Sequence, residues 1–571
     1  MIYLDIETDG LTPTKIWIAV TRENGKAEVH YNADSLSEAL QGSDKIVGQN
    51  LIGFDILVLK RLWDVYIEPE RVLDTLVLSR LANPQRDKGH SLRSWGERLG
   101  FPKGDYNDWT RCSEEMVKYC IQDTAVTEKA YEAILEELTG FSQESIDLEH
   151  GVYTIVHQQI ENGWLLDQEK AYLLLAELKE KQFEVEDKVQ KTFLPLPTFI
   201  KEVQPKTKKD GTLSTVGLKF LGDSWGTVEG PFSRIEFPLF NLGSRQQIGR
   251  HLQHFGWKPC VFTETGQPQV DEGTLSKIKG IPEAKLIAEY LMVQKRIAQV
   301  QSWIEAASPD TGRVHGKVNS NGAVTGRMTH NSPNLAQVPA SYSPYGKECR
   351  ECWTVKEGYK LVGFDASGLE LRMLAHYMDD KEYIYEVVNG DIHTTNQKLA
   401  GLESRDTAKT FIYALLYGAG DAKLGAVVGG NQKTGRQLRG RFSHNLKSFG
   451  ILRDGIQRKI ANGSQMVTGL DGRKLHIRSQ HSALNTLLQS AGAVVMKQAL
   501  LILEDYAKRW KLDYRFVGNI HDEVQTEVNT KHAEKFGRLA VSCIEAAGNH
   551  FNLNCPLAGE YKIGDNWYET H

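Results

Sequence analysis

Residues 361–372 read LVGFDASGLELR, and the fold of the surrounding chain depends on this stretch. Residues 362–364 are typical of the end of a buried strand, and Asp365 ends the apolar run. Ser367 and Glu370 have the spacing of a capping box, which predicts that a helix begins here. The sequence therefore predicts a carboxylate held where a strand passes into a helix.

The predicted helix has one apolar face, formed by Leu371, Leu374, Ala375 and Met378. A carboxylate beside such a core cannot stay charged without a partner, and a metal ion is the obvious one. Taken alone, Asp365 is better explained as a cap or turn residue.

A second stretch, residues 517–528, reads VGNIHDEVQTEV and sets Asp522 and Glu523 among β-prone residues. Two adjacent acids inside a strand are costly unless something binds them. A tight hairpin turn with two solvated acids is the alternative. Ile520 and Val524 flank the acids without glycine or proline, which favours a strand.

The composition bounds the class of protein. The chain has 571 residues, 40% hydrophobic and 25% charged, which is ordinary for an enzyme of several domains. Apolar runs fall short of the ~18 residues of a membrane helix, and the N-terminus lacks a secretory pattern, so we expect a cytoplasmic protein that binds no membrane. The net charge of −5 allows one local basic cleft. Seven cysteines, including Cys349 and Cys352, predict reduced thiols rather than a disulfide framework.

Acidic residues recur in three N-terminal segments. Residues 2–7 alternate, so Asp5 and Glu7 share one face of a strand. Asp55 begins an apolar helix, and Tyr119 and Asp123 lie one turn apart on another helical pattern. Four acids from three segments could hold two divalent cations for phosphodiester hydrolysis. A solvated edge strand better explains the Asp-x-Glu pattern alone, but all three segments in this order form a strong signal.

These segments resemble the DEDD exonucleases of the tyrosine-bearing subclass. The resemblance implies an RNase-H-like α/β fold and a water molecule oriented by Tyr119. It also implies metal binding by Asp5, Glu7, Asp55 and Asp123. Asp74 lies nearby in the sequence and is a further candidate.

The middle of the chain is mainly helical by pattern. Periodic apolar residues at 144–162, 168–193, 241–256 and 281–307 predict a helical spacer. Residues 194–240 contain prolines, glycines and a lysine cluster, which predicts a solvated loop or hairpin insertion, with a phosphate-backbone contact as the alternative. The polar residues 315–339 form either a plain surface loop or a surface for phosphates and minor-groove edges.

A further helix combines cations and aromatic rings. Four side chains recur at every fourth position along ~18 Å of helix: Arg405, Lys409, Tyr413 and Tyr417. The cations at the start of the helix match the phosphates of a nucleoside triphosphate, and the rings at its end match the flat base. The alternative is an amphipathic helix whose basic end is solvated. Glycines at 418 and 420 end the helix where a base pair needs space. Asn485 and Gln489 lie on one face of a later predicted helix. Their amides could read acceptors in the minor groove of a duplex, or they could cap the helix.

Together these motifs resemble the family A (pol I-type) DNA polymerases, most closely the replicative polymerases of T7-like phages. The resemblance runs from Asp5 to His571. It implies an α/β and α+β multidomain fold. An RNase-H-like 3′–5′ exonuclease would occupy residues 1–140, a helical thumb and linking region residues 141–340 with a short insertion near 194–240, and palm and fingers residues 341–571.

The resemblance also implies roles for single residues. Asp365 and Asp522 would be the catalytic metal ligands, assisted by the carbonyl of Ala366, with Glu523 as the adjacent acid. Glu370 would crowd the ribose 2′ position. The other nucleotide-binding residues would be His393, Arg405, Lys409, Tyr413 and Tyr417, and the residues that contact primer-template DNA would be Arg327, Gln489 and His521.

The implied reaction is attack of a primer 3′-hydroxyl on the α-phosphate of a dNTP, with two Mg²⁺ ions at this site and two at the exonuclease site. Lys409 is a candidate proton donor to the pyrophosphate. If the chain replicates a phage genome, a helicase-primase and a processivity factor are expected partners. T7-like polymerases recruit host thioredoxin through a long thumb insertion, and the shorter insertion here argues against thioredoxin binding.

Two other classes of enzyme fit part of the pattern. A single-subunit RNA polymerase shares the palm acids and a tyrosine like Tyr413, but the exonuclease acids and Glu370 argue against it. A DNA-binding nuclease with an inactive polymerase half is opposed by the intact pair Asp365 and Asp522. The sequence leaves open whether the role is replication or repair.

Overall fold

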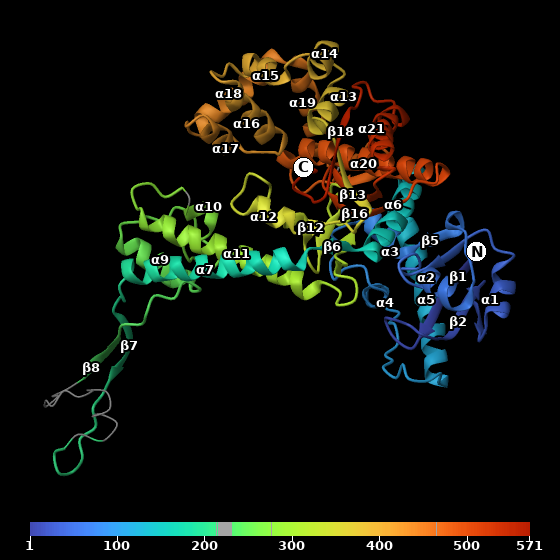
Figure 1. The fold of residues 1–571 in the computed structure, drawn as a ribbon, viewed down its shortest axis with the longest axis horizontal. Coiled ribbons are helices and arrows are strands. Elements are labelled where there is room, and N and C mark those ends of the chain that lie inside the picture. Colours follow the sequence, from blue (N-terminus) through green and yellow to red (C-terminus); the bar gives the residue numbers. More distant parts are fainter. Residues whose placement is uncertain (213, 215–230, 276, 464) are drawn as a thin grey trace. The chain divides into compact units, whose positions relative to one another are not determined.

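The computed structural model describes residues 1–571 apart from 213, 215–230, 276 and 464, so part of the 194–240 insertion lies outside the described residues. The chain forms two compact units (Figure 1). The first combines Met1–Asp167 with Ala306–His571, and the second comprises Gln168–Glu305.

The N-terminal part of the first unit is built on a mixed five-stranded sheet. Its strands are β1 (Ile2–Thr8), β2 (Ile16–Glu23), β3 (Lys26–His30), β4 (Ile46–Gly48) and β5 (Val72–Asp74), in the order β3-β2-β1-β4-β5. The first three strands pair antiparallel, whereas β4 pairs parallel with both β1 and β5. This topology agrees with the RNase-H-like fold expected from the sequence.

Helices cover both faces of this sheet. They are α1 (Ala33–Leu40), α2 (Asp55–Trp63), α3 (Thr75–Ala82), α4 (Leu92–Arg98) and α5 (Glu114–Glu137). Leu4 and Ile6 of β1 pack in a core with α1 and α2. Tyr3 packs on the other face with α3 and α5, and alternation sets Asp5 and Glu7 on that same face. The predicted alternation along β1 is therefore confirmed.

The C-terminal part of the first unit contains an antiparallel four-stranded sheet. Its strands are β13 (Tyr359–Ala366), β16 (Tyr514–Ile520), β17 (Glu523–Asn529) and β18 (Gly559–Gly564), in the order β16-β17-β13-β18. One face shares a core with α13 (Leu369–Met378), α20 (Ala483–Arg509) and α21 (Ala533–His550). Phe364 and Val524 are paired and lie in this core. Their neighbours Asp365 and Glu523 therefore lie on the opposite face.

The start of α13 differs from the prediction. The helix begins at Leu369, after Gly368 in the left-handed conformation at φ 60°, and no side chain caps it. Glycine takes this conformation without a Cβ penalty, so the chain turns at Gly368 and not at a serine cap. The capping box of Ser367 and Glu370 is therefore wrong. The apolar face is confirmed, since Leu371, Leu374, Ala375 and Met378 are all buried.

The stretch around Asp522 also differs. β16 ends at Ile520 and β17 begins at Glu523, so His521 and Asp522 form a two-residue hairpin turn. His521 has φ 61°, the positive value that such turns use. The predicted continuous strand is therefore wrong. The acids are nevertheless not fully solvated, because Asp522 is half-buried and Glu523 is 9% exposed.

Six helices lie between α13 and α20 in the described part of the chain. They are α14 (Lys381–Asn389), α15 (Ile392–Ala400), α16 (Arg405–Leu416), α17 (Asp421–Val427), α18 (Gln432–Asn445) and α19 (Lys447–Ala461). The apolar side of α16 is buried and includes Phe411, Ile412 and Leu415. The predicted helix with a cation-and-ring face is confirmed, with Tyr417 as its C-terminal cap residue.

A buried ion cluster joins α6 (Gln143–Asn162) to α20. Glu149 accepts a hydrogen bond from Lys497 at 2.5 Å and forms an ion pair with Arg473 at 2.8 Å, and each of the three residues is at most 2% exposed. Residues 480–509 form one helix that is long and apolar enough to cross a membrane, but 72% of its apolar window is buried inside the protein. It is the central core helix of the C-terminal part (Figure 1).

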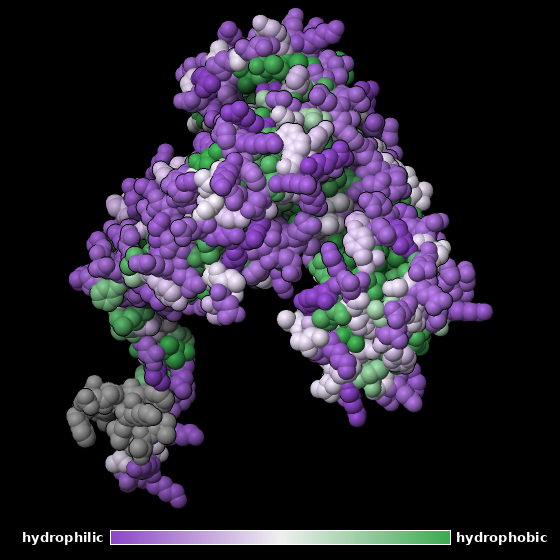
Figure 2. Space-filling model, turned by 45° about the vertical axis from the view of Figure 1, so that its right-hand side comes forward, coloured by the Kyte–Doolittle hydropathy of each residue, from purple (hydrophilic) through white to green (hydrophobic). Residues whose placement is uncertain are grey.

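The second unit is helical, with one hairpin. Its helices are α7 (Gln168–Thr192), α9 (Arg245–His254), α10 (Glu272–Leu275) and α11 (Glu283–Ala306), and its strands are β7 (Thr198–Val203) and β8 (Phe232–Glu236). β7 and β8 pair antiparallel, so the described part of the 194–240 insertion is a hairpin, as predicted. Figure 2 shows apolar surface gathered beside the grey stretch. Exposed apolar side chains around this hairpin include Leu194, Phe199, Ile235, Phe237 and Leu239.

Candidate functional site

Three strands bring carboxylates together on the face of the C-terminal sheet opposite α20. Asp365 of β13 pairs with Glu523 of β17 on one side and with Glu560 of β18 on the other. Residues directly opposed across antiparallel strands have Cβ atoms about 4.5–5.5 Å apart. The turn residue Asp522 is near enough to influence the ionisation of Asp365. The structure therefore joins the two predicted aspartates and adds Glu560, which the sequence analysis missed.

These acids disfavour one another's charged forms. Burial, followed by the charges of Glu560, Asp522 and Glu523, raises the pKa of Asp365 to about 6. Burial and the charge of Glu370 raise the pKa of Asp522. A cluster of carboxylates with raised pKa values is the arrangement that a bound cation stabilises.

Glu523 is held by hydrogen bonds from the C-terminal residues. Trp567 Nε1 donates to Glu523 Oε1 at 2.5 Å, Gln525 Nε2 donates to the same oxygen at 2.6 Å, and His571 Nδ1 lies 2.9 Å from Oε2. Burial raises the pKa of Glu523, but the hydrogen bond and charge of His571 outweigh it and lower the pKa below its ordinary value. Glu523 is therefore fixed in position as a charged group.

The C-terminal residues reach Glu523 because they pack directly on β13. A Cβ on Gly363 would lie 2.6 Å from the carbonyl oxygen of Thr570, so only glycine fits there. Thr570 also donates to Gln525 Oε1 at 2.9 Å. The absence of a side chain at Gly363 thus allows the chain terminus to support the acidic cluster.

Glu370 bonds to side chains, not to its own helix terminus. Tyr417 Oη donates to Glu370 Oε1 at 3.0 Å, and Arg327 Nη2 lies 3.4 Å from the same oxygen. Desolvation and the charge of Arg327 lower the pKa of His521, while Asp522 raises it. Arg327 and His521, predicted to contact DNA, therefore lie beside Asp522 and Glu370.

The face of α16 carries the predicted cations and rings. Arg405 Nε donates to Asp391 at 2.7 Å, and this aspartate also caps the start of α15. Burial and the charges of Arg405 and Lys409 lower the pKa of His393. The structure thus brings together His393, Arg405 and Lys409, with Asp391 as a partner that the sequence analysis did not single out.

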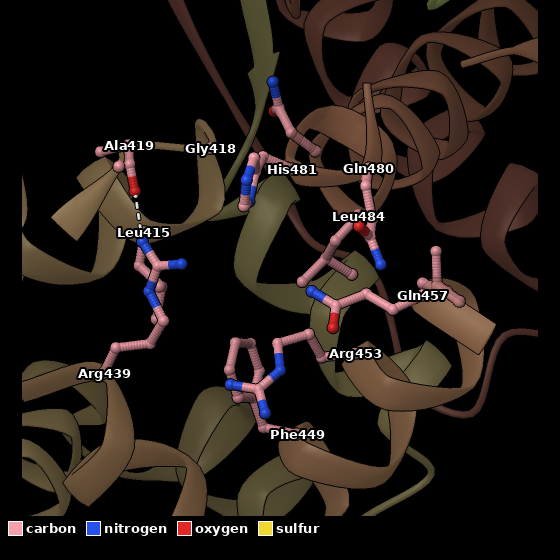
Figure 3. Close-up of a pocket in the computed structure, with 13 residues that line it drawn as sticks. Leu415, Gly418, Ala419, Arg439, Phe449, Arg453, Gln457, Gln480, His481 and Leu484 are labelled. Atoms are coloured by element: carbon pink, nitrogen blue, oxygen red, sulfur yellow. Dashed lines mark hydrogen bonds between the residues drawn. The ribbon is translucent and has the colours of Figure 1, made fainter. Parts of the chain in front are cut away.

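Aromatic rings continue this face towards a pocket. The ring of Tyr413 lies 6.1 Å from that of His393 and 6.4 Å from that of Tyr417, to which it is nearly parallel. Beyond Tyr417, residues 418–420 border a pocket that Arg453, Gln457, Gln480 and Leu484 line from the other side (Figure 3). A pocket therefore lies at the end of α16, next to the glycines.

The first turns of α20 border the same pocket. Asn485 lines it, and the buried Oδ1 atom of this amide has no hydrogen-bond partner. Gln489 lies one turn further along α20 and is half-buried. An unpartnered buried acceptor is costly unless a donor reaches it.

A second acidic cluster lies on the N-terminal sheet. Ligand atoms of Asp5, Glu7 and Cys120 all lie within 4.8 Å of one another. Asp55 is 5% exposed and accepts from the amide of Ile6 at 3.2 Å. Asp123 of α5 is 2% exposed. The structure brings together all four predicted acids, and it adds Cys120, whose thiol the sequence analysis did not single out.

Burial raises the pKa values in this cluster. Burial and the charge of Asp123 raise the pKa of Asp5 to about 7, and burial with the charges of Asp5 and Asp123 raises that of Glu7 to about 9. Burial also raises the pKa values of Asp55 and Asp123. Asp123 Oδ1 is buried without a hydrogen-bond partner. An orphaned carboxylate oxygen among further acids fits a hard divalent cation.

Tyr119 lies next to this cluster in an aromatic environment. Its ring centroid is 5.6 Å from that of Tyr106 and 6.0 Å from that of Trp109. Lys103, from the chain between α4 and α5, forms an ion pair with Asp123. The sequence analysis missed Lys103, because no periodic pattern marks a loop residue.

Asp74 has a structural role. Its carboxylate accepts from the backbone amides of Asn50, Ile52 and Leu76 at 2.9–3.0 Å, and its side chain is fully buried. These bonds cap α3 and fix the chain that leads to Asp55. The acceptor sites of Asp74 are therefore largely occupied by protein groups.

Comparison with known proteins defines the class. The model of the family described as DNA polymerase family A matches residues 227–569. The chain belongs to DNA polymerase family A.

Within family A, the chain is similar to DNA polymerases of phages and of bacteria. The chain is 34% identical over 705 aligned residues to the DNA-directed DNA polymerases of Enterobacteria phage T3 and Escherichia phage T7, with 100% of each chain covered. It is also 29% identical over 370 residues to the thermostable DNA polymerase I of Thermus filiformis, covering 60% of this chain and 43% of that protein.

A solved structure shows the same fold. The POL domain of Pol1 from M. smegmatis, in complex with DNA primer-template and dNTP, superposes with a TM-score of 0.79 at 16% sequence identity. The match covers 100% of this chain and 95% of that chain. The expected multidomain polymerase fold is therefore confirmed.

Proposed function

We propose that the chain is a template-directed DNA polymerase that adds dNTPs to a primer 3′-hydroxyl and proofreads with a 3′–5′ exonuclease. The observation that carries the proposal is the acidic cluster of Asp365 and Asp522 beside the cation-and-ring face of α16. Tyr417 Oη donates to Glu370 Oε1 at 3.0 Å, and the ring of Tyr417 lies 6.4 Å from that of Tyr413, so the ring end of α16 lies beside the start of α13, close to the end of β13. A triphosphate on α16 would thus have its reacting end near the aspartates.

The residues of α16 and α15 would bind the nucleotide. Arg405, Lys409 and His393 supply donors for the phosphates, and Arg405 would exchange its contact with Asp391 for one with phosphate. Tyr413 would pack against the sugar and base, and Tyr417 would line the new base pair. Lys409 would give a proton to the departing pyrophosphate.

Asp365 and Asp522, with the carbonyl of Ala366, would hold two Mg²⁺ ions. The raised pKa of Asp365 supports this assignment, since the cluster needs positive charge. Bound cations supply charge stabilisation for the attacking and leaving oxygens. Glu523 acts differently, because three protein donors already occupy its oxygens and it would position the neighbouring Asp522.

The second acidic cluster would carry out proofreading. Asp5, Glu7, Asp55 and Asp123 would hold two further Mg²⁺ ions, and the orphaned Asp123 oxygen supports a ligand there. Tyr119 would orient the attacking water. The similarity to the phage polymerases runs through these N-terminal residues, since it covers the whole chain.

We propose the same domain assignment as the one predicted from the sequence. Residues 1–140 would be the exonuclease, 141–340 the thumb and linking region with the insertion near 194–240, and 341–571 the palm and fingers. Primer-template DNA would contact Arg327, Gln489 and His521. Replication of a phage genome, with a helicase-primase and a processivity factor as partners, is the role that the phage relatives support.

Primer extension and end digestion test both activities. Wild-type protein should extend a primed template with dNTPs and Mg²⁺, whereas Asp365→Asn and Asp522→Asn should not. A double variant, Asp5→Ala with Glu7→Ala, should keep extension and lose digestion of a single-stranded oligonucleotide. Extension by Asp365→Asn at the wild-type rate would refute the polymerase assignment. Faster use of ribonucleotides than of deoxynucleotides would favour an RNA polymerase instead.

A further inference from the structure

Lys103 is a partly buried cation within the second acidic cluster. The side chain of Lys103 is 19% exposed and pairs with Asp123, whose side chain is 3% exposed. Its Nζ atom lies 4.5 Å from the ring centroid of Tyr119. In the described part of the chain, Asp5, Glu7 and Asp55 form no ion pair, so Lys103 supplies the ammonium of this cluster.

The loop that carries Lys103 is anchored on both sides. Gln122 of α5 donates from Nε2 to the carbonyl of Pro102 at 2.9 Å, and the amide of Phe101 donates to the carbonyl of Gly96 at 2.9 Å. A Cβ on Gly96 would lie 2.9 Å from the amide nitrogen of Lys103, so the backbones approach closely there. The backbone position of Lys103 is therefore fixed by contacts with α4 and α5.

Another lysine of the N-terminal part also lies near an aromatic ring, but it is exposed and is not part of the second acidic cluster. Lys60 lies 5.7 Å from the ring centroid of Tyr66 on the same N-terminal part, but it is exposed. Burying a lysine costs free energy unless the charge is paired, and its partner here is an acid proposed to bind metal. A lysine used only for stability could pair with any of the many exposed acids.

We propose that Lys103 is a positioning residue of the exonuclease reaction, which fixes Asp123 and Tyr119 relative to each other. This inference rests on the proposed exonuclease function. Through its two contacts, the ammonium holds the carboxylate and the ring in one arrangement before metal and DNA arrive. Because Lys103 and a divalent cation both approach Asp123, the lysine also competes with the cation and raises the Mg²⁺ concentration that the reaction needs.

The test uses full-length protein and three substitutions. Lys103→Met removes the charge, Lys103→Arg keeps it, and Lys60→Met is the matched control at an exposed lysine beside a tyrosine. Single-turnover digestion of a 3′-labelled single-stranded oligonucleotide is measured across a Mg²⁺ titration. Primer extension by the same preparations reports whether each variant is folded.

Lys103→Met should slow digestion on the order of 100-fold at saturating Mg²⁺, because a misplaced reacting group costs about that much. Its half-saturating Mg²⁺ concentration should fall, since the competitor at Asp123 is gone. Lys103→Arg should recover part of the rate, and Lys60→Met should match the wild type. In a Tyr119→Phe background the effect of Lys103→Met should shrink, because the two residues act together.

The experiment distinguishes failure of the Lys103 proposal from failure of the proposed exonuclease function. If Lys103→Met digests as fast as the wild type with the same Mg²⁺ dependence, while Asp5→Ala with Glu7→Ala is inactive, Lys103 has no role and the exonuclease function stands. If wild-type protein digests nothing with Mg²⁺ or Mn²⁺, both proposals fall. Should Lys103→Met also lose primer extension, Lys103→Gln replaces it under the same criteria.

Discussion

Tyr417 donates a hydrogen bond to Glu370 at 3.0 Å, and this contact joins the end of α16 to the first turn of α13. Arg327 approaches the same carboxylate oxygen at 3.4 Å. Glu370 is thus held from two sides in a part of the site that borders the proposed nucleotide. A carboxylate fixed in this way can exclude an extra hydroxyl on the sugar by steric and electrostatic means.

Replacing Glu370 should relax sugar selection. Glu370→Ala removes the fixed carboxylate, so incorporation of ribonucleotides relative to deoxynucleotides should rise on the order of 100-fold. Tyr417→Phe removes one hydrogen bond and leaves the carboxylate in place, so its effect should be smaller. Steady-state kcat/KM for matched dNTP and rNTP substrates measures both variants. Equal selectivity in Glu370→Ala and wild type would contradict this role.

The terminal histidine should support the polymerase site. His571→Ala removes one hydrogen bond to Glu523, so the extension rate should fall roughly 10-fold and more Mg²⁺ should be required. His550→Ala is the matched control, because His550 also bonds to a carboxylate, Glu144, at 2.7 Å on the surface. If both variants extend primers alike, Glu523 needs no support from the chain terminus.

The exonuclease cluster should make the metal-free protein sensitive to pH. The pKa values of Asp5 and Glu7, raised to about 7 and about 9 from ordinary values of 3.8 and 4.5, mean that the folded state keeps protons that the unfolded state releases. Their stabilising contribution is present below the ordinary values and is lost as the pH rises through 7 and 9.

Thermal unfolding in EDTA should therefore show a Tm that falls between pH 6 and 9.5. Asp5→Asn with Glu7→Gln should flatten this dependence, since neither amide ionises. Saturating Mg²⁺ should restore stability at high pH, because a cation binds the charged carboxylates. A Tm that stays constant in EDTA over this range would show that burial does not hold the protons.

The buried ion cluster should be required for stability. Glu149→Gln leaves Lys497 and Arg473 without their shared carboxylate, which should lower the free energy of unfolding by about 3–5 kcal/mol. Glu534→Gln, which breaks an exposed pair with Arg538, is the control and should leave the urea midpoint unchanged. Similar midpoints for the two variants would show that the buried cluster contributes little.

Thioredoxin should not increase processivity. The described part of the insertion is a hairpin, β7 with β8. The resemblance described in the sequence analysis implies a longer insertion for a thioredoxin-binding polymerase. Product lengths on a long primed single strand, with an excess of unprimed trap DNA, should be the same with and without thioredoxin. Longer products with thioredoxin would assign the exposed apolar residues of the hairpin to that partner.

Local patterns in the sequence predicted much of both sites. The alternation along β1 identified Asp5 and Glu7, and the period of four along α16 identified its cations and rings. These predictions succeed because the side-chain direction in a strand or helix repeats over a few residues. The predicted capping box fails because a neighbouring glycine can start α13 without it, while Tyr417 and Arg327 bond to Glu370.

The sequence by itself determined which side chains could bind metal and nucleotide, since residue type and short-range period carry that information. Only the tertiary structure decided which of these side chains contact one another. Strand register set Glu560 opposite Asp365, packing on Gly363 brought His571 to Glu523, and an anchored loop delivered Lys103 to Asp123. Each of these contacts joins segments far apart in the chain, and it depends on how whole elements pack, which no local pattern encodes.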